Sequence, residues 1–357
     1  MDIINCALKT GTFPDAYKIS EIVAIPKVLP PKELKDLRPI SKTPVGGKIL
    51  EKMILSDLDF DTKSTLIDSS QFGNSRGCST THYLIKATNE AFKSTDRGGA
   101  TTAITIDYSK AFDLVDHTTL IKKLLSLGVR SNLIKIIISF LSNRKHYTKI
   151  NNAKSNLVEI TCGVPQGTLS GPKFFTALIH LEKCGLVANY KFVDDKTLVH
   201  SYTGDCTSFL QRVLDIEATE TEKDKMVLNE TKCNVITFNF SKKNIAPQNL
   251  QLNGNPLNPV SSIKLLGVTI TEDLRWKENT SQICKKVNKK FHFLRVLSVV
   301  HRKTELLLNA WKVLLRPITE YAAPLWHSGL SKSDNNKLES LQKKSSWNHF
   351  RYNLSRL

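Results

Sequence analysis

The sequence predicts a mixed α/β fold followed by a separate helical unit. Short runs rich in β-branched residues alternate with segments of helical periodicity up to about residue 270. From about Trp276 onward only helical patterns occur, in VNKKFHFLRVL and ELLLNAWKVLL. The chain has 357 residues, which is enough to bury a sizeable core in two or three structural units.

The first predicted elements are a β-hairpin and a helix. SEIVAIPKV is an apolar run that ends at Pro26 before the turn VLPPKE, and Arg38 begins the return strand. GKILEKMILSDL has apolar residues at helical spacing. A buried strand follows within TTAITIDYSKAFD, and it delivers Asp107 at its carboxyl end.

Two helices and a glycine-rich loop are predicted next. Asp116 is placed to cap a helix that stops at Gly128, and Ser131 is placed to cap the helix of SNLIKIIISFL. The loop CGVPQGTLSGP then leads into FFTALIHL, whose apolar residues indicate a third helix.

A hairpin, a helix and two strands complete the mixed region. KFVDDKTLV places Asp194 and Asp195 at the tip of the hairpin, between two strand-forming runs. A helical segment then reaches about Met226. The strands are VITF and KLLGVTI, with the turn QLNGNPL between them.

The charge of the chain indicates a polyanionic partner. Lys and Arg number 51 against 33 Asp and Glu, a net charge of +18. From Arg275 to the C-terminus there are 17 basic and 5 acidic residues, a net charge of +12, so the helical unit carries most of the excess. Nucleic acid or an acidic membrane surface fits this charge, and a basic face kept only for solubility is the alternative.

The cysteine pattern and the apolar runs argue against several classes of protein. The seven cysteines are scattered, with no CxxC and no His pair at zinc spacing, which indicates reduced thiols in an intracellular protein. The longest apolar run, LIKIIISFL, is far shorter than the roughly 20 residues of a membrane span. The start MDIINCALKTG lacks the features of a secretion signal, so we expect the protein in the nucleus or cytoplasm, without a membrane partner.

Acidic side chains at the ends of strands indicate a metal site. Asp107 closes a buried strand, and Asp194 and Asp195 stand together at a bend, where their repulsion gains nothing for folding. Hard cations such as Mg²⁺ take oxygen ligands and are held by carboxylates together with substrate phosphates. Two such ions about 4 Å apart promote phosphoryl or nucleotidyl transfer. The alternative is that the Asp pair only forms a tight turn.

Three ordered motifs resemble those of a known family. TIDYSKAFDLVDH, GVPQGTLSGP and KFVDD look like successive palm motifs of the reverse transcriptases of non-LTR (LINE-type) retrotransposons, especially jockey-like elements. The resemblance extends over most of the chain, through the flanking segments IPKV, RPIS, QFGNSRGCSTTH, LNETKC, KLLGVTI, LRWKENTSQICKKVNKKFHFLR and LRPITEYAAPLWHSGL.

The resemblance implies a right-hand polymerase with fingers, an α+β palm and a helical thumb. Residues 1–100 would form the fingers and the approach to the palm, 101–270 the palm with its primer grip, and 271–357 the basic thumb and C-terminal tail. The implied activity is RNA-directed DNA synthesis from an RNA template, a DNA primer and dNTPs, with two Mg²⁺ ions or with Mn²⁺ as substitute. The main alternative is a truncated or domesticated copy that binds nucleic acid without polymerising.

The same resemblance assigns the catalytic carboxylates. Asp107 and Asp194 would ligate both metal ions, and Asp195 would be a less direct third carboxylate. Asp113 and Asp116 are also acidic and nearby, but helix capping or ion pairing explains them, so we leave them outside the metal site.

The nucleotide would be held by residues from several motifs. Phe112 lies where reverse transcriptases place a bulky aromatic that clashes with a ribose 2′-OH, whereas RNA-dependent RNA polymerases usually carry an Asp there. A core, turn or surface role is the alternative for each candidate. The other candidates are Lys27 and Arg38 for the triphosphate, Gln166 and Gly167 for the pocket lining, and Lys232 for protonation of the pyrophosphate.

Two further regions would contact the nucleic acid. Gly267 in LLGV would let the primer backbone approach closely, although a strand bulge also explains it. The basic helix would follow the template–primer duplex through salt-dependent phosphate contacts of Lys285, Lys286, Lys289 and Lys290.

Lys196 is the main departure from the family pattern. It stands directly after the two acids, where Thr is usual. A cation there is expected to pair with Asp195 and to compete with Mg²⁺. On this interpretation, Lys196→Thr would restore activity to a damaged copy.

Overall fold

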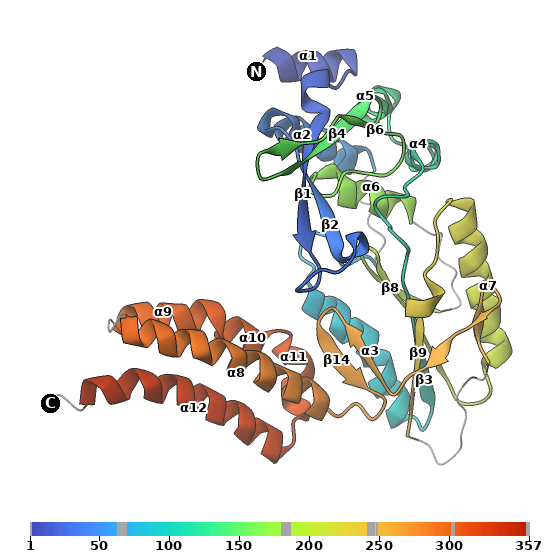
Figure 1. Cartoon of the computed structure of the whole chain (residues 1–357). Coiled ribbons are helices and arrows are strands. Elements are labelled where there is room, and N and C mark those ends of the chain that lie inside the picture. Colours follow the sequence, from blue (N-terminus) through green and yellow to red (C-terminus); the bar gives the residue numbers. More distant parts are fainter. Residues whose placement is uncertain are drawn as a thin grey trace.

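In the described part of the chain, the fold is built on two five-stranded β-sheets, with a group of long helices at the C-terminal end. The computed structural model describes residues 2–62, 70–179, 187–240, 247, 249–300 and 304–354. Figure 1 shows a helix-rich part with a long β-hairpin at the top, a central sheet below it, and the C-terminal helices projecting to one side. We call these three parts fingers, palm and thumb. The fingers defined in this way include residues 117–178, which the sequence analysis placed in the palm.

The palm sheet has five strands in the order β12-β9-β3-β8-β7. Its middle strand β3 (Ala100–Ile106) pairs antiparallel with β8 (Asp195–Tyr202) on one side and with β9 (Asn234–Asn239) on the other. β7 (Ala188–Phe192) and β8 form the outer hairpin, and β12 (Asn258–Pro259) lies parallel to β9.

Alternating residues of β3 face two different hydrophobic cores, as the two-residue period of a strand requires. Ile104 and Ile106 belong to the core that includes α7 (Thr207–Lys223), whereas Ala103 belongs to the core that includes α3 (Thr80–Asp96). Helices therefore cover both faces of the palm sheet (Figure 1). Because both faces of the sheet are covered, polar side chains that react with a substrate are expected at the ends of its strands.

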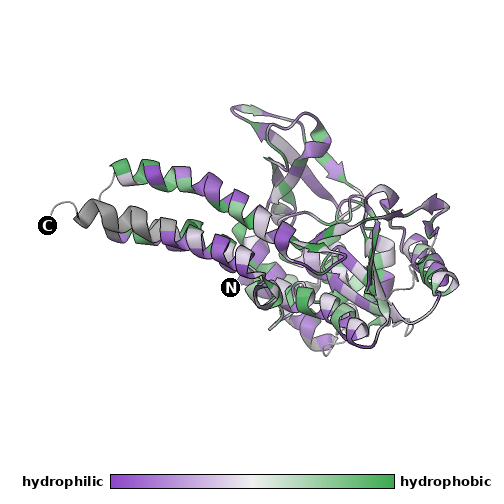
Figure 2. Ribbon diagram, turned by 90° about the horizontal axis from the view of Figure 1, so that it is seen from below, coloured by the Kyte–Doolittle hydropathy of each residue, from purple (hydrophilic) through white to green (hydrophobic). Residues whose placement is uncertain are grey.

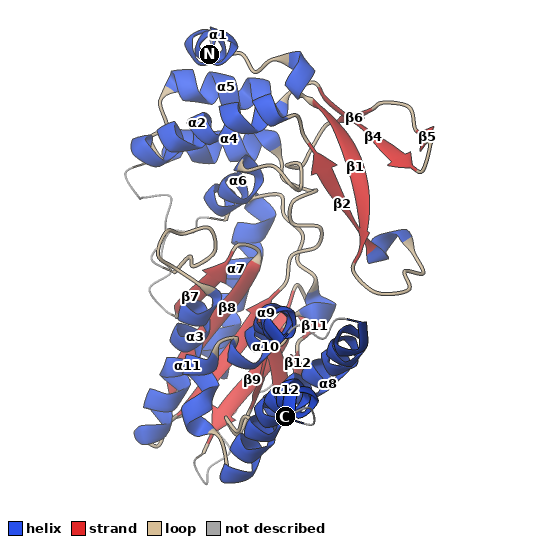
Figure 3. Ribbon diagram, turned by 90° about the vertical axis from the view of Figure 1, so that its left-hand side faces the viewer, coloured by secondary structure: helices blue, strands red, loops and turns tan. Residues whose placement is uncertain are grey.

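The fingers contain the second sheet. β1 (Ile19–Pro26) and β2 (Leu37–Lys42) form the predicted antiparallel hairpin. β1 also pairs in parallel with β4 (Arg144–Ile150), a long-range pairing that the sequence does not predict. β4 pairs further with β5 (Ala153–Lys154) and β6 (Val158–Ile160), and Figure 3 shows this sheet beside the helices of the fingers.

Three helices of the fingers begin within two residues of their predicted positions, and a fourth begins four residues before the predicted segment FFTALIHL. The helix Asp2–Thr10 was not predicted. Asp116 caps α4 as expected, because its Oδ1 accepts a hydrogen bond from the Thr119 backbone N–H at 2.8 Å. The expected cap at Ser131 is wrong by one residue: Ser131 is the first helical residue, and Arg130 precedes it without a side-chain cap. These helices are α1 (Asp2–Thr10), α2 (Val45–Asp61), α4 (His117–Ser126), α5 (Ser131–Leu141) and α6 (Ser170–Leu178).

The segment KLLGVTI forms a hairpin, so the prediction of a single strand there was wrong. β13 (Ser262–Leu265) and β14 (Val268–Thr271) pair antiparallel across the two-residue turn Leu266–Gly267. Both turn residues have positive φ, +41° at Leu266 and +89° at Gly267, as in the primed turns of tight hairpins. Sequence reasoning missed the turn because only its second residue is a glycine.

Five helices form the thumb, and the first two agree with the sequence prediction. In Figure 2 long helices extend away from the rest of the molecule, with hydrophobic and hydrophilic residues alternating along them. No helix in the described part of the chain is long and apolar enough to cross a membrane. The thumb helices are α8 (Lys277–Val300), α9 (Thr304–Leu314), α10 (Arg316–Glu320), α11 (Ala323–Trp326) and α12 (Lys332–Leu354).

Candidate active site

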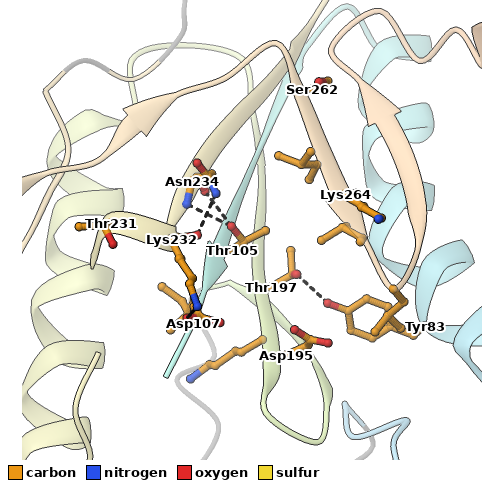
Figure 4. Close-up of a pocket in the computed structure, with 15 residues that line it drawn as sticks. Tyr83, Thr105, Asp107, Asp195, Thr197, Thr231, Lys232, Asn234, Ser262 and Lys264 are labelled. Carbon is orange, nitrogen blue, oxygen red and sulfur yellow. Dashed lines mark hydrogen bonds and ion pairs between the residues drawn. The ribbon is translucent and has the colours of Figure 1, made fainter. Parts of the chain in front are cut away.

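The carboxylates predicted at the strand ends meet at one edge of the palm sheet. Asp107 follows the last residue of β3, and Asp195 is the first residue of the neighbouring strand β8. The last paired residues of these strands are Ile106 and Lys196, so Asp107 and Asp195 lie side by side just beyond them. Both line a cavity of about 470 Å³ that extends to the β13–β14 hairpin (Figure 4).

The β7–β8 turn that carries Asp194 is fixed by a segment on the other side of β7. Val193 has φ +59°, which is strained for a β-branched residue. The side-chain oxygen of Gln71 accepts hydrogen bonds from the backbone N–H groups of Val193, at 3.0 Å, and Gly73, at 2.9 Å. A Cβ on Gly73 would lie 2.6 Å from the Val193 nitrogen, so glycine is needed there. Gln71 was missed as a site residue, since its contact with Val193 is not visible in the sequence.

The electrostatics of Asp194 and Asp195 suit a cation-binding site. Burial raises the pKa of Asp194, repulsion from Asp107 adds to the rise, and Arg38 acts in the opposite direction. Burial, with repulsion from Asp194 and Asp107, raises the pKa of Asp195 to about 6. The ionised acids therefore destabilise one another when no cation is bound.

Lys232 and Cys233 contact Asp107 directly. The Lys232 ammonium lies 3.7 Å from Asp107 Oδ2, and the Asp107 backbone N–H donates to Cys233 Sγ at 3.4 Å. Figure 4 shows the side chains of Lys232 and Asp107 next to each other. Among the described residues, no three His, Cys, Asp or Glu side chains are grouped closely enough to hold a metal ion by themselves. The carboxylates of this site offer hard oxygen atoms as metal ligands. Such oxygens suit Mg²⁺, which is commonly bound by one or two carboxylates plus substrate phosphates.

Lys196 does not pair with Asp195, so that expectation was wrong. Successive residues of a strand point to opposite faces, and the ammonium of Lys196 reaches Glu217 of α7, although the residue also lines part of the carboxylate cavity. It is 1% exposed and forms an ion pair with Glu217 of α7, with Nζ 2.6 Å from Oε1. Its charge is thus neutralised by a partner that sequence reasoning did not consider.

The two residues predicted to bind the triphosphate lie on or next to the fingers hairpin. Arg38 lies on β2 opposite Ile25 of β1 and is exposed, within electrostatic range of Asp194. Lys27 is also exposed, but its ammonium donates to the Lys35 carbonyl at 2.9 Å and supports the hairpin turn. Arg38 is therefore the better placed of the two.

Phe112, Gln166 and Gly167 contact α6, the segment that follows β3, and β2, respectively. The Phe112 ring stacks on Phe175 of α6, with ring centroids 5.1 Å apart, so its position is fixed by the core. Gln166 Nε2 donates to Asp113 Oδ1 at 3.0 Å. Gly167 has φ +104°, and a Cβ there would lie 2.8 Å from the Ser41 carbonyl of β2. Glycine is required at this position by the approach of β2, independently of any nucleotide.

Gly267 occupies the turn of the β13–β14 hairpin, not a strand bulge. The space around its Cβ position is open except for the ring of Tyr321, at 3.7 Å. The Tyr321 hydroxyl donates to the Leu266 carbonyl at 2.6 Å and so ties the hairpin to the thumb. Leu265 and Leu266 line the carboxylate cavity, so this hairpin forms one wall of it.

The four lysines predicted to follow the duplex are exposed on α8. Other residues of this helix, Ile283 and Val287 among them, are buried. The helix therefore presents a basic surface without needing these lysines for packing. The exposed residues are Lys285, Lys286, Lys289 and Lys290.

A palm sheet with carboxylates at two adjoining strand ends, next to a fingers hairpin and a helical thumb, defines the class of right-hand polymerases. Residues 26–270 match the family described as reverse transcriptase (RNA-dependent DNA polymerase), and the chain belongs to this family. The predicted fold and the predicted resemblance to non-LTR, jockey-like enzymes are thereby confirmed.

Known relatives agree with this assignment. The RNA-directed DNA polymerase from mobile element jockey of Drosophila melanogaster is 28% identical over 96% of this chain and 38% of its own length. The probable RNA-directed DNA polymerase from transposon BS of the same organism is 27% identical over 95% of this chain and 39% of its own length. This chain thus corresponds to less than half of either relative.

Solved structures support the fold alone. Telomerase from Candida albicans, in complex with the TWJ fragment of telomeric RNA, superposes with a TM-score of 0.51 at 12% sequence identity. The match covers 96% of this chain and 66% of the telomerase chain. Apo telomerase from Candida tropicalis gives a TM-score of 0.51 at 13% identity over 94% of this chain and 63% of that chain.

Proposed function

We propose that this chain catalyses RNA-templated DNA synthesis. The 3′-OH of a primer attacks the α-phosphate of a dNTP, the bond to the β-phosphate breaks, and pyrophosphate leaves. The observation that carries the proposal is that Asp107 and Asp195 line one cavity, with Asp194 next to Asp195 and within electrostatic range of Asp107, in a chain of the reverse transcriptase family. The excess of positive charge in the thumb fits the polyanionic substrate.

The carboxylates would hold the divalent cations on which the family generally depends. Two Mg²⁺ ions, when bound, activate the attacking oxygen and stabilise the leaving one. Asp107 and Asp194 would bind both ions, and Asp195 would add negative charge beside them. Lys232 would leave Asp107 when the cations bind, and it would then be available to protonate the departing pyrophosphate.

The nucleotide would be oriented by residues from the fingers and palm. Arg38, with help from Lys27, would bind the triphosphate, because a guanidinium forms paired hydrogen bonds with phosphate oxygens. Phe112, fixed by its contact with Phe175, would exclude a ribose 2′-OH and so favour dNTPs. Gln166 and Gly167 would line the pocket next to it.

A nucleic-acid-binding copy without polymerase activity is the second candidate. The ion pair between Lys232 and Asp107 favours it, because a cation must displace that lysine before chemistry can begin. Primer extension by the purified chain on an RNA template with Mg²⁺, run with dNTPs and in parallel with rNTPs, decides between the candidates. Extension with dNTPs supports the proposal, and duplex binding without extension supports the second candidate. A preference for rNTPs would instead indicate an RNA polymerase.

Metal binding should weaken in mild acid. Burial and the neighbouring acids raise the pKa of Asp195 from 3.8 to about 6, so lowering the pH from 7 to 5 protonates this carboxylate and should weaken Mn²⁺ binding roughly tenfold. The raised pKa also means that the folded, metal-free chain binds the proton more tightly than the unfolded chain. Its stability should therefore fall as the pH rises from about 4 to about 6.

Calorimetric titration with Mn²⁺ at several pH values measures how Mn²⁺ affinity depends on pH. Asp195→Asn should flatten the plot of Mn²⁺ affinity against pH between pH 5 and 7. Asp116→Asn, which keeps a capping residue, should not flatten it. An unchanged profile in Asp195→Asn would show that another group causes the pH dependence.

The basic face of α8 should contribute salt-dependent binding. Lys289→Ala combined with Lys290→Ala should lower the slope of log affinity against log salt by roughly 1 to 2, since each lost phosphate contact removes about 0.7 to 0.9. The matched control is Lys86→Ala with Lys93→Ala on α3, which changes the net charge equally. Fluorescence anisotropy with an RNA–DNA duplex at several salt concentrations measures this slope for both double variants. Equal slopes for the two double variants would contradict a specific role of α8.

A further inference from the structure

The residues that directly follow Asp107 and Asp195 converge on a single side chain. The side chains of Tyr108 and Lys196 both reach α7. The Tyr108 hydroxyl donates to Glu217 Oε1 at 3.2 Å, and the Lys196 ammonium contacts both Glu217 oxygens, with 2.6 Å to Oε1. Glu217 of α7 therefore joins the two strand ends that carry the carboxylates.

This connection is deeply buried. As whole residues, Tyr108, Lys196 and Glu217 are 8%, 2% and 5% exposed. Tyr108 and Glu217 also line a small cavity together with Thr221 and Asp224. In such surroundings both charged groups need their partners, since an unpaired buried charge is costly. Glu217 is thus held at a defined point, with Oε1 shared between two strands.

The connection lies where the backbone pairing of these strands ends. The β3–β8 ladder stops at the pair Ile106 and Lys196, so no further pair of this ladder fixes Asp107 relative to Asp195. On its other side, the Asp107 carbonyl accepts a hydrogen bond from Asn229, which attaches it to the chain leading into β9. The Glu217 contacts are the described side-chain link between the ends of β3 and β8 on the α7 face.

We propose that Glu217 is a positioning residue that sets the spacing of Asp107 and Asp195 from behind the sheet. The inference rests on the proposed function of these carboxylates as metal ligands. Groups that hold metal ligands in place change metal affinity by about 10- to 100-fold when they are removed. A pair that serves stability alone would change the stability without changing metal affinity.

Three variants of the full chain separate these roles. Glu217→Gln removes the carboxylate, Tyr108→Phe removes only the contact from β3, and Lys123→Met serves as the control. Lys123 pairs with Asp224 just after the same helix, at 2.7 Å, in a partly buried ion pair. Asp224 lines the same small cavity as Tyr108 and Glu217, so this variant removes a neighbouring buried pair and leaves the Glu217 contacts in place. Each variant is compared with the wild type for Mn²⁺ affinity without primer or dNTP, for amide hydrogen exchange of the β7–β8 turn, and for the midpoint of unfolding.

Glu217→Gln should weaken Mn²⁺ binding roughly tenfold or more and speed exchange in the turn, and Tyr108→Phe should weaken binding about threefold. Lys123→Met should lower the midpoint of unfolding and leave both other measurements within twofold. If Glu217→Gln and Tyr108→Phe behave like Lys123→Met, the positioning role is refuted. If Glu217→Gln does not fold, the double variant Lys196→Met with Glu217→Leu replaces it. The proposal would be refuted if this double variant had the Mn²⁺ affinity of the wild type and the same amide exchange in the β7–β8 turn.

Failure of this inference is distinguishable from failure of the proposed function. A wild type that binds Mn²⁺ but does not extend primers refutes polymerase activity and leaves the Mn²⁺ comparison valid. A wild type that does not bind Mn²⁺ refutes the metal site, and the exchange rates of the turn then decide whether Glu217 fixes it. Where extension is observed, Glu217→Gln should raise the Mg²⁺ concentration for half-maximal rate and leave KM for dNTP unchanged.

Discussion

Replacing Asp194 by Asn is expected to reduce RNA-templated primer extension by on the order of 10³-fold. The amide keeps the size of the side chain but removes the negative charge that would hold both cations. Since burial and repulsion from Asp107 already raise the pKa of Asp194, the ionised group is unfavourable in the metal-free chain. The variant should therefore fold at least as stably as the wild type.

The measurement is single-nucleotide extension at saturating dNTP, together with duplex binding and thermal unfolding. Asp116→Asn is the matched control, because it makes the same chemical change at the cap of α4 and Asn caps a helix as well as Asp does. Activity of Asp194→Asn within tenfold of the wild type would exclude Asp194 as a ligand of both ions. Loss of duplex binding would show that the substitution acts on the fold and not on the chemistry.

The parts of this site that could be predicted from the sequence depend on local patterns. Asp107 follows a buried strand, and the Asp194–Asp195 pair lies at a turn between two strand-forming runs, so each position is fixed by its neighbours in the chain. The order of the motifs then places the two elements in one palm. The α2 helix and the β1–β2 hairpin were predictable for the same reason.

The parts that could not be predicted depend on contacts between distant segments. The parallel pairing of β1 with β4 leaves no periodic signal in either strand. Gln71 contacts Val193 across the edge of the sheet, and an isolated Gln has many possible partners. Lys196 could be placed next to Asp195 in the chain, but the face on which it lies and its pairing with Glu217 follow only from the packing of α7.

That pairing reverses the expected effect of Lys196→Thr. The sequence interpretation treats this change as a repair that removes a competitor of Mg²⁺. In the structure the lysine neutralises Glu217, and the two side chains are 1% and 6% exposed. Removal of one partner of a buried ion pair typically costs about 3–5 kcal/mol, so Lys196→Thr should destabilise the chain by this amount and gain no activity.

Urea unfolding followed by circular dichroism measures the free energy of unfolding. Lys42→Thr is the matched control: Lys42 is also a strand lysine with a glutamate partner, Glu21 at 3.5 Å, but its side chain is 70% exposed, so the loss should stay below about 1 kcal/mol. Lys196→Thr combined with Glu217→Leu should recover most of the stability, because no unpaired charge remains. Gain of primer extension by Lys196→Thr alone would show that the lysine does reach the carboxylate pocket, and that its pairing with Glu217 is weaker than the geometry indicates.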